Sequence, residues 1–227
     1  MLLPFEKLPK EFQNDQVKKY YNILVKKKKS LYLKRVCDIV LSAILIILLI
    51  LPILVISLIV KVTSKGPVLY RQIRVTKYNR EFKILKFRTM VQNADQLGTL
   101  VTEFNDPRIT KIGGFLRKYR LDELPQVFNV FVGDMSFVGT RPEVPKYVAS
   151  YKKNMYATLL MPAGITSLAS IKFKNEDKLL KNSTDVDGDY INIILPKKMH
   201  YNLLYINSFG IKTDTYLMLK TVKEVLH

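Results

Sequence analysis

The sequence predicts a mainly helical α+β protein that is attached to a membrane. Three observations support this fold class: an uncharged apolar run from Ile39 to Val60, two β-favouring segments within 66–90, and apolar residues at helical spacing in much of the remaining chain. Of the 227 residues, 48% are apolar, so the chain is not a disordered one. Its length suits one domain with a real core.

The first segment predicts an amphipathic helix over residues 12–33, with lysines around one apolar face. The residues that can share this face are Phe12, Tyr20, Tyr21, Leu24 and Leu31. Such a pattern is typical of a helix that lies in the membrane interface, although a lysine-rich helix in solvent is the alternative. We therefore interpret residues 1–36 as a basic interfacial segment.

The apolar run comes next, and its topology has two interpretations. As a straight helix it would extend roughly 33 Å at about 1.5 Å per residue, which is enough to span a membrane. Basic residues lie on both sides of it, however, and basic flanks prefer the cytoplasmic face. These residues are Lys26, Lys27, Lys28, Lys29, Lys34 and Arg35 before it, and Lys61, Lys65, Arg71, Arg74 and Lys77 after it. Pro52 is expected to break or bend the helix. A re-entrant helix-break-helix over 37–61 and a single span both remain open.

Residues 62–227 are interpreted as one catalytic domain that contains both strands and helices. The segment 66–90 predicts a β-hairpin with its turn near Tyr78 and Asn79. Helices are predicted at 111–119, from Asp122 onward, and at 147–153, 175–182, 189–208 and 212–226. Residues 105–110, 133–145 and 162–170 are predicted to be irregular because of their Gly, Pro and Asn content.

Charge and composition limit the partners and the chemistry. The chain has 37 Lys and Arg against 19 acids, a net charge of +18. Nucleic acid, anionic lipid headgroups and phosphorylated substrates are the usual partners of such an excess. The single cysteine, Cys37, excludes an intrachain disulfide, and only two histidines are available for a metal site or a catalytic triad.

Acids and cations gather around Asp122 and Glu123, which follow Arg117, Lys118 and Arg120. One interpretation is structural, because acids at a first helical turn cap free N–H groups and complement the helix dipole. The other is catalytic: a helix N-terminus binds phosphate, and an ionised carboxylate there could attack phosphorus. The second carboxylate could hold Mg²⁺, which prefers one or two carboxylates plus substrate phosphates.

Other polar residues could complete such a site. Arg141 could bind a phosphate with its planar fork of donors, as a lysine cannot. Lys86 and Arg88 could also bind phosphate, although a basic strand face is the commoner meaning. Asp134 follows Gly133 and could be either a turn former or a second acid.

Several long motifs together resemble those of the bacterial sugar transferases that are monotopic phosphoglycosyl transferases, in their minimal form. The matching stretches are KRVCDIVLS, residues 66–90 and 105–145, PAGITSLAS, and the tail from Ile194 to Val222. The resemblance runs from about Lys34 to Val222. Three positions depart from the family's usual motifs: Leu51 before Pro52, Thr140 before Arg141, and Met161 before Pro162.

The resemblance implies a re-entrant membrane helix, interfacial helices and a small catalytic part on the cytoplasmic face of the bacterial inner membrane. The implied reaction moves a sugar 1-phosphate from a UDP-sugar to a polyprenyl (undecaprenyl) phosphate, releases UMP, uses Mg²⁺ and initiates polysaccharide or glycoconjugate assembly. Asp122 would attack the β-phosphorus, and Glu123, with Asp122, would hold the metal. Arg117 and Arg141 would contact phosphates. Further residues on site-lining positions are Lys86, Arg88, Gln126 and Asp134.

The resemblance also makes anionic membrane lipids an expected partner and nucleic acid not one, while an oligomer is left open. Two alternatives remain. An ordinary UDP-sugar glycosyltransferase would release UDP instead of UMP. A membrane-tethered nucleic-acid-binding protein would explain the charge but would leave the LDELPQ and GTRPEVP motifs without a purpose.

Overall fold

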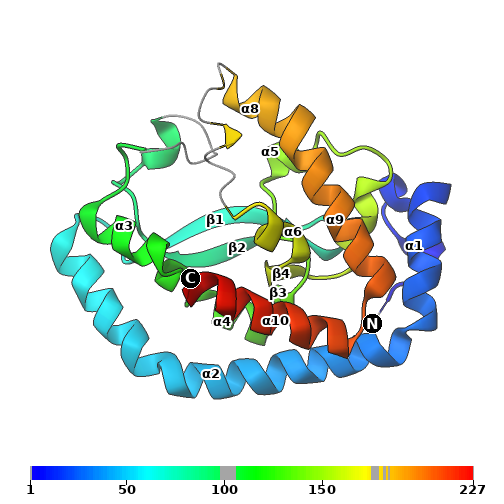
Figure 1. The fold of residues 1–227 in the computed structure, drawn as a ribbon, viewed down its shortest axis with the longest axis horizontal. Helices are drawn as coiled ribbons and strands as arrows, with labels where there is room; N and C mark the ends of the chain where they lie inside the picture. Colours follow the sequence, from blue (N-terminus) through cyan, green and yellow to red (C-terminus); the bar gives the residue numbers. More distant parts are fainter. Residues whose placement is uncertain (1, 98–105, 175–178, 181–182, 184, 227) are drawn as a thin grey trace.

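A long helix bends around one side of the molecule, and the remaining elements lie on its concave side (Figure 1). The computed structural model describes residues 2–97, 106–174, 179–180, 183 and 185–226. The mainly helical α+β class is confirmed, as is the hairpin, and a small parallel sheet adds to them.

The described part of the chain begins and ends with helices, and its four strands lie between them. The helices are α1 (Asp15–Lys26), α2 (Lys28–Thr63), α3 (Lys111–Lys118), α4 (Gln126–Val132), α5 (Pro145–Val148), α6 (Leu168–Lys172), α8 (Val186–Asp189), a π-helix (Tyr190–Ile194), α9 (Leu195–Ser208) and α10 (Ile211–Leu226). The strands are β1 (Leu69–Thr76), β2 (Arg80–Phe87), β3 (Met135–Val138) and β4 (Ala163–Thr166). Short 3-10 turns lie at Phe5–Lys7, Lys10–Phe12, Lys77–Asn79, Ala94–Gln96, Leu121–Glu123 and Met155–Leu160.

The apolar run lies within α2, which is long and apolar enough to cross a membrane by length and composition. Only 11% of its most apolar window is buried. Pro52 was expected to break or bend the helix; α2 continues through this residue without a break, and Figure 1 shows α2 as one bent helix. Proline removes one backbone donor and crowds the preceding turn, and inside a continuous helix a bend, the second of the two expected outcomes, is its usual effect.

Polar residues near the start of α2 fasten it to the rest of the protein. The Lys34 ammonium lies 2.6 Å from Asp214 of α10, and both side chains are buried. Arg35 donates to the carbonyl oxygens of Val130 and Phe131 at the end of α4, at 2.7 and 2.9 Å. These contacts fix α2 before its exposed apolar part begins.

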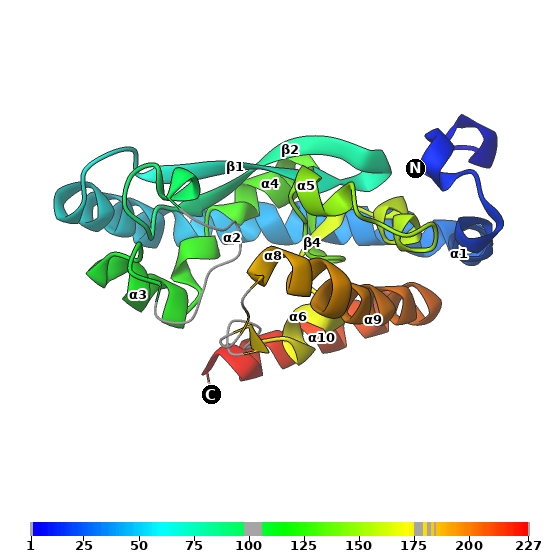
Figure 2. The ribbon, with the colours of Figure 1, turned by 90° about the horizontal axis from the view of Figure 1, so that it is seen from above.

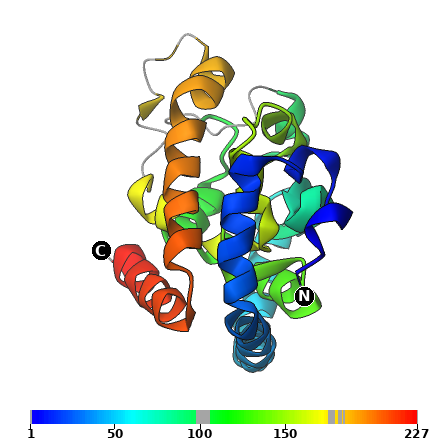
Figure 3. The same ribbon diagram turned by 90° about the vertical axis from the view of Figure 1, so that its right-hand side faces the viewer.

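The apolar face of α1 packs on protein. Val17 and Leu24 of α1, with Phe12 of the preceding 3-10 turn, are fully buried in one core cluster with residues of α9 such as Met199. Figure 3 shows α1 and α9 side by side, with α10 and the start of α2 below them. The prediction that this face lies in the membrane interface is therefore wrong. Its amphipathic pattern arises because one side of α1 covers the protein core.

The predicted hairpin is confirmed. Strands β1 and β2 pair antiparallel, from Leu69 opposite Phe87 to Thr76 opposite Arg80. Tyr78 and Asn79 turn the chain with φ values of 60° and 62°. Figure 2 shows the hairpin on one side of α2 and helices α9 and α10 on the other.

Two stretches predicted to be irregular contain strands instead. β3 and β4 pair in parallel, with Met135 opposite Ala163. Each is only four residues long and lies among glycines and prolines, and its partner is distant in sequence. Local pattern therefore indicated loops, although the pairing is made by non-local contacts.

The other helix predictions have mixed outcomes. Residues 111–118, 189–208 and 212–226 are helical, which confirms the predictions at 189–208 and 212–226 and the one at 111–119 except for its last residue; residues 106–110 belong to no helix. The helix expected at 147–153 is wrong, because α5 ends at Val148 and turns follow. Most of the helix expected at 175–182 lies outside the described residues.

Candidate functional site

The two adjacent acids, Asp122 and Glu123, lie in the 3-10 turn Leu121–Glu123, one turn before α4. The prediction that an α-helix begins at Asp122 is wrong by about one turn, because α4 begins at Gln126 and Pro125 occupies its N-cap position. No side chain caps either element. The structural interpretation of the acids as helix caps is therefore not supported, which leaves their carboxylates available for other contacts.

Glu123 is held by cations from two other elements. Its Oε1 accepts a hydrogen bond from Lys86 Nζ of β2 at 2.9 Å and another from Arg141 Nη2, in the segment after β3, at 2.7 Å. Its side chain is 10% exposed. Burial alone would raise the pKa of Glu123, but the charges of Arg141 and Lys86 hold it well below its ordinary value. Glu123 is therefore ionised in the folded protein.

Asp122 is buried, and its Oδ1 has no hydrogen-bond partner among the described residues. Burial raises the pKa of Asp122 above its ordinary value; Lys86 acts against this effect, whereas the charge of Glu123 adds to it. Buried polar atoms without a partner are rare in folded proteins. An orphaned carboxylate oxygen beside three cations therefore indicates a place where a ligand is bound.

Gln126 adds a second orphaned group on the same stretch. Its side chain is 1% exposed, and its Nε2 has no partner within the described part of the chain. Gln126 follows Asp122 by four positions along a backbone that is helical from Leu121 onward, so both residues lie on one face. The amide donor and the carboxylate acceptor thus stand on the same side of the turn.

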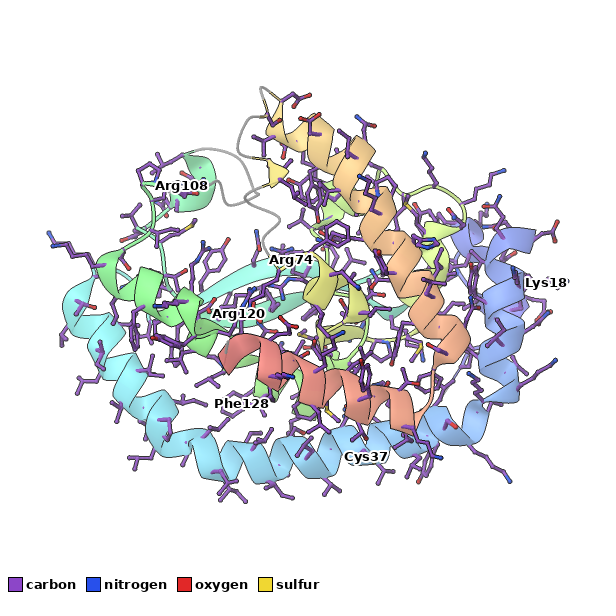
Figure 4. All side chains as sticks on the ribbon, in the orientation of Figure 1. Lys18, Cys37, Arg74, Arg108, Arg120 and Phe128 are labelled. Carbon is purple, nitrogen blue, oxygen red and sulfur yellow. The ribbon has the colours of Figure 1, made fainter. Side chains whose placement is uncertain are left out.

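Arginines complete the surroundings of the two acids. Arg117 of α3 donates from Nε to Thr89 Oγ1 at 3.0 Å, and its charge acts on Asp122. Arg120 begins the 3-10 turn with a φ of 56°. In Figure 4, Arg120 and Arg74 lie toward the middle of the molecule, between α3 and α9, whereas Lys18 lies at its outer edge on α1.

Two of the predicted site residues, Arg88 and Asp134, make the contacts described for them with residues other than the two acids. Arg88 donates to the carbonyl and hydroxyl oxygens of Ser64 at 2.6 and 2.7 Å, and also to the carbonyl of Pro67, so it holds the chain just after α2. Asp134 accepts a hydrogen bond from Arg80 at 2.9 Å, beyond the opposite end of α4 from Asp122. No hydrogen bond described for either side chain goes to Asp122 or Glu123.

Sequence reasoning missed Thr89 and Arg74 as members of this region. Arg74 Nη1 donates to the carbonyl of Pro142, next to Arg141, at 3.0 Å. A signal for Arg74 was present in the hairpin: Lys86 lies opposite Tyr70, and alternate residues of β1 share its face, which includes Arg74. No comparable pattern marked Thr89.

A divalent cation fits this pair of acids. Mg²⁺ takes one or two protein carboxylates together with substrate phosphates. Asp122 offers an unpartnered oxygen, and Glu123 uses only Oε1 for its two cations. Among the described residues, no group of three or more His, Cys, Asp or Glu side chains could hold a metal. The acids alone would therefore bind such an ion weakly without a phosphorylated ligand.

Comparison with known proteins gives one consistent result. A family model described as bacterial sugar transferase matches residues 29–227. The chain is 36% identical over 200 residues to an undecaprenyl-phosphate N-acetylgalactosaminephosphotransferase of Aeromonas hydrophila, which covers 86% of this chain and 44% of that protein. It is 39% identical over 196 residues to a UDP-glucose:undecaprenyl-phosphate glucose-1-phosphate transferase of Escherichia coli. The aligned residues make up 84% of this chain and 39% of that protein.

A shorter relative matches over most of its own length. A putative undecaprenyl-phosphate N-acetylgalactosaminyl 1-phosphate transferase of Bacillus subtilis is 37% identical over 146 residues, which is 64% of this chain and 81% of that protein. The chain spans less than half the length of the Aeromonas and Escherichia relatives. The match includes all the residues described around Asp122 and Glu123.

Proposed function

The chain belongs to the bacterial sugar transferase family, and from that membership we propose that it transfers a sugar 1-phosphate from a UDP-sugar to a polyprenyl phosphate such as undecaprenyl phosphate. The product would initiate polysaccharide or glycoconjugate synthesis. The observation that carries this proposal is the orphaned Asp122 carboxylate beside Glu123, Lys86 and Arg117. A buried carboxylate among cations suits a nucleophile that must meet a diphosphate.

The reaction proceeds in two steps. A carboxylate oxygen of Asp122 attacks the β-phosphorus of the UDP-sugar, and the bond from that phosphorus to the oxygen bridging the two phosphates breaks. UMP leaves with this oxygen, and the sugar phosphate remains on Asp122 as an acyl phosphate ester. An oxygen of the polyprenyl phosphate then attacks the same phosphorus, which frees the Asp122 carboxylate and forms a polyprenyl diphosphate sugar.

Charged side chains support both steps. Lys86, Arg117 and Arg141 offset the charge of the diphosphate and, in the second step, of the lipid phosphate. Asp122 and Glu123 would hold Mg²⁺, which supplies further charge neutralisation at the phosphates when it is bound. Gln126 offers its amide donor to the ligand, since this group has no partner within the described residues.

The membrane placement belongs to the same proposal. α2 would enter the cytoplasmic leaflet of the bacterial inner membrane and return to the same side. Its bend, its exposed apolar residues and the basic residues at both ends support a re-entrant helix over a single span. Anionic headgroups attract juxtamembrane Lys and Arg by about 1 kcal/mol each near the surface, which gives the charge of +18 a role in docking.

Topology is tested by cysteine labelling. Cys37 is exposed and must first be replaced by serine. Single cysteines are then introduced near residues 28 and 65 and labelled from one side of sealed vesicles. Both should react from the cytoplasmic side; labelling from opposite sides would establish a span instead.

The chemical proposal is tested with Asp122→Asn. The variant should lose turnover by a factor on the order of 10⁴ or more, as removal of a covalent nucleophile does, while it still binds membranes. Asp15→Asn, which changes an exposed aspartate of α1, is the matched control and should keep full activity. Full activity in Asp122→Asn would exclude this residue as the nucleophile.

Two further readouts identify the reaction. Wild-type protein is incubated with Mg²⁺ and UDP-glucose, UDP-galactose or UDP-N-acetylgalactosamine, and intact mass should show one added phosphosugar with the true donor. The released nucleotide should be UMP. Release of UDP would identify an ordinary glycosyltransferase, and tight salt-sensitive binding of DNA without any turnover would favour a nucleic-acid-binding protein.

A further inference from the structure

The segment that carries Arg141 is irregular, yet its backbone is fixed on both sides of this residue. Thr140 accepts a hydrogen bond from Gly164 N of β4 at 2.8 Å, and Pro142 accepts one from Arg74 at 3.0 Å. The next residue, Glu143, accepts one from Val75 N of β1 at 2.9 Å. Arg141 is thus presented to Glu123 from a segment tied to both sheets.

The side chain of Glu143 adds an anchor that the proposed chemistry does not use. Its Oε1 accepts a hydrogen bond from the Tyr190 hydroxyl at 2.8 Å and lies 3.3 Å from Lys198 Nζ, which also donates to the Tyr190 hydroxyl at 2.8 Å. All three residues are 4% exposed or less. We call Glu143, Tyr190 and Lys198 the loop triad.

The presence of a buried ion pair is weak evidence that its role is stability. Apolar residues of similar size often give equal or greater stability, since burying two charges removes them from water. A fixed set of charge and hydrogen bonds, in contrast, specifies one position for the groups that it joins. Tyr190 is moreover the first residue of the π-helix Tyr190–Ile194. π-helices are rare in proteins, and those that occur are often found at functional sites.

We propose that the loop triad is a positioning device that holds Arg141 against the acids and so places its guanidinium for the phosphates of the substrate. This inference rests on the proposed function, because it gives Arg141 a phosphate to bind. No hydrogen bond or ion pair described for the triad joins it to Asp122 or Glu123, so we place its action in the segment between Thr140 and Glu143. Glu143, Tyr190 and Lys198 are positioning residues in this sense.

The proposal is tested by a double-mutant cycle between Tyr190→Phe and Arg141→Ala. Tyr190→Phe removes one hydroxyl and leaves the ion pair, so the protein is expected to fold. This hydroxyl makes two buried hydrogen bonds, and a loss of positioning equivalent to about one of them should lower kcat/KM with the true donor about 5- to 10-fold. In the Arg141→Ala background the same change should have little further effect, because the group that the triad positions is already absent.

A matched control is available at the other end of α9. Tyr205 is also a buried tyrosine whose hydroxyl donates to a lysine-paired carboxylate, that of Asp214, at 2.7 Å. Tyr205→Phe should lower the melting temperature about as much as Tyr190→Phe but leave kcat/KM unchanged. A purely structural role for Tyr190 would make the two variants alike in both measurements.

The outcomes separate the two proposals. Unchanged kcat/KM in Tyr190→Phe, or losses that multiply independently in the double variant, would overturn the positioning role while sugar transfer stands. If the wild-type protein releases no UMP with any donor, the proposed function fails first, and the positioning role fails with it.

Discussion

Two buried clusters, each made of one acid, one tyrosine and one lysine, hold different parts of this protein. In the loop triad, Lys198 and Tyr190 surround Glu143; in the second cluster, Lys34 and Tyr205 surround Asp214. We call the latter the anchor triad. In the loop triad the lysine lies 3.3 Å from the carboxylate, and in the anchor triad it lies 2.6 Å away.

The difference lies in what each triad joins. The loop triad connects α9 and the π-helix to the segment that presents Arg141. The anchor triad connects α2, whose apolar part is exposed, to α9 and α10. The side-chain chemistry of a buried cluster therefore does not tell its role. The role follows from which elements of the fold the cluster connects.

Removal of either carboxylate should have the largest effect on stability and should also separate the triads. Glu143→Gln and Asp214→Asn each leave a buried lysine without its carboxylate, which costs about 3 to 5 kcal/mol when one partner of a buried pair is lost. Both should therefore lower the free energy of unfolding by similar amounts in denaturant titrations in detergent. Only Glu143→Gln should also lower kcat/KM per folded molecule.

An exposed ion pair gives the control for this comparison. Lys146 pairs with Asp187 near α5, with the lysine side chain 53% exposed. Lys146→Met should change the free energy of unfolding by about 1 kcal/mol or less. Equal loss of kcat/KM in the Glu143 and Asp214 variants would mean that both triads are structural, and the distinction between them would be lost.

A backbone contact beneath Arg141 should have the next largest effect. A Cβ added at Gly164 of β4 would lie 2.1 Å from Gly139 N and 2.5 Å from Gly139 O, both rigid backbone atoms. Gly164→Ala should therefore push the Arg141 segment away from β4, at a cost of about 1 to 3 kcal/mol in stability, as overpacking does. Its kcat/KM should fall as it does when the loop triad is broken.

The matched substitution is Gly114→Ala in α3. An added Cβ there meets nothing within 4 Å, and alanine is favoured over glycine inside a helix by about 1 kcal/mol. Gly114→Ala should keep or slightly raise the melting temperature and leave kcat/KM unchanged. A Gly164→Ala protein as active and as stable as wild type would show that the position of residue 139 does not matter.

The sequence predicts the features whose signals are local. The hairpin follows from β-favouring residues around Tyr78 and Asn79, and α3 and α10 follow from helical spacing. Asp122 and Glu123, with Lys86 and Arg141, are found from their residue types and motif positions, and the structure brings all four together. The hydrogen bonds described for Arg88 and Asp134 go to other parts of the chain, and their place in the site stays a prediction.

Neither triad could be predicted, because its members are far apart in sequence. Glu143 and Tyr190 are 47 positions apart, and Lys34 and Asp214 are 180 positions apart. A lone buried lysine such as Lys198 resembles any other lysine until its partner is known. The prediction for the apolar face of α1 failed for the same reason. An amphipathic pattern shows that one face of a helix is covered, but not whether lipid or protein covers it.

The smallest effect is expected in the free energy of unfolding at acidic pH, where Glu143 of the loop triad takes up a proton. Burial alone would raise the pKa of Glu143, but the charges of Lys198 and Arg74 and the hydrogen bond from Tyr190 hold it below its ordinary value of 4.5. The unfolded chain therefore takes up this proton first as pH falls. Ionised Glu143 thus stabilises the fold above about pH 4.5, and this contribution is lost as pH falls through the lower pKa of the folded state.

In the Glu143→Gln variant the neutral amide cannot take up a proton in this pH range, so this contribution to the pH dependence is absent. The difference in unfolding free energy between wild type and Glu143→Gln should be constant at neutral pH and should shrink as pH falls below 4.5. Denaturant titrations from pH 7 to pH 3 measure it, with Tyr190→Phe as a variant that keeps the carboxylate and so retains most of the pH dependence. A difference that stayed constant down to pH 3 would mean that the negative charge of Glu143 does not contribute to the stability of the fold. Lys198 would then be stabilised by other groups.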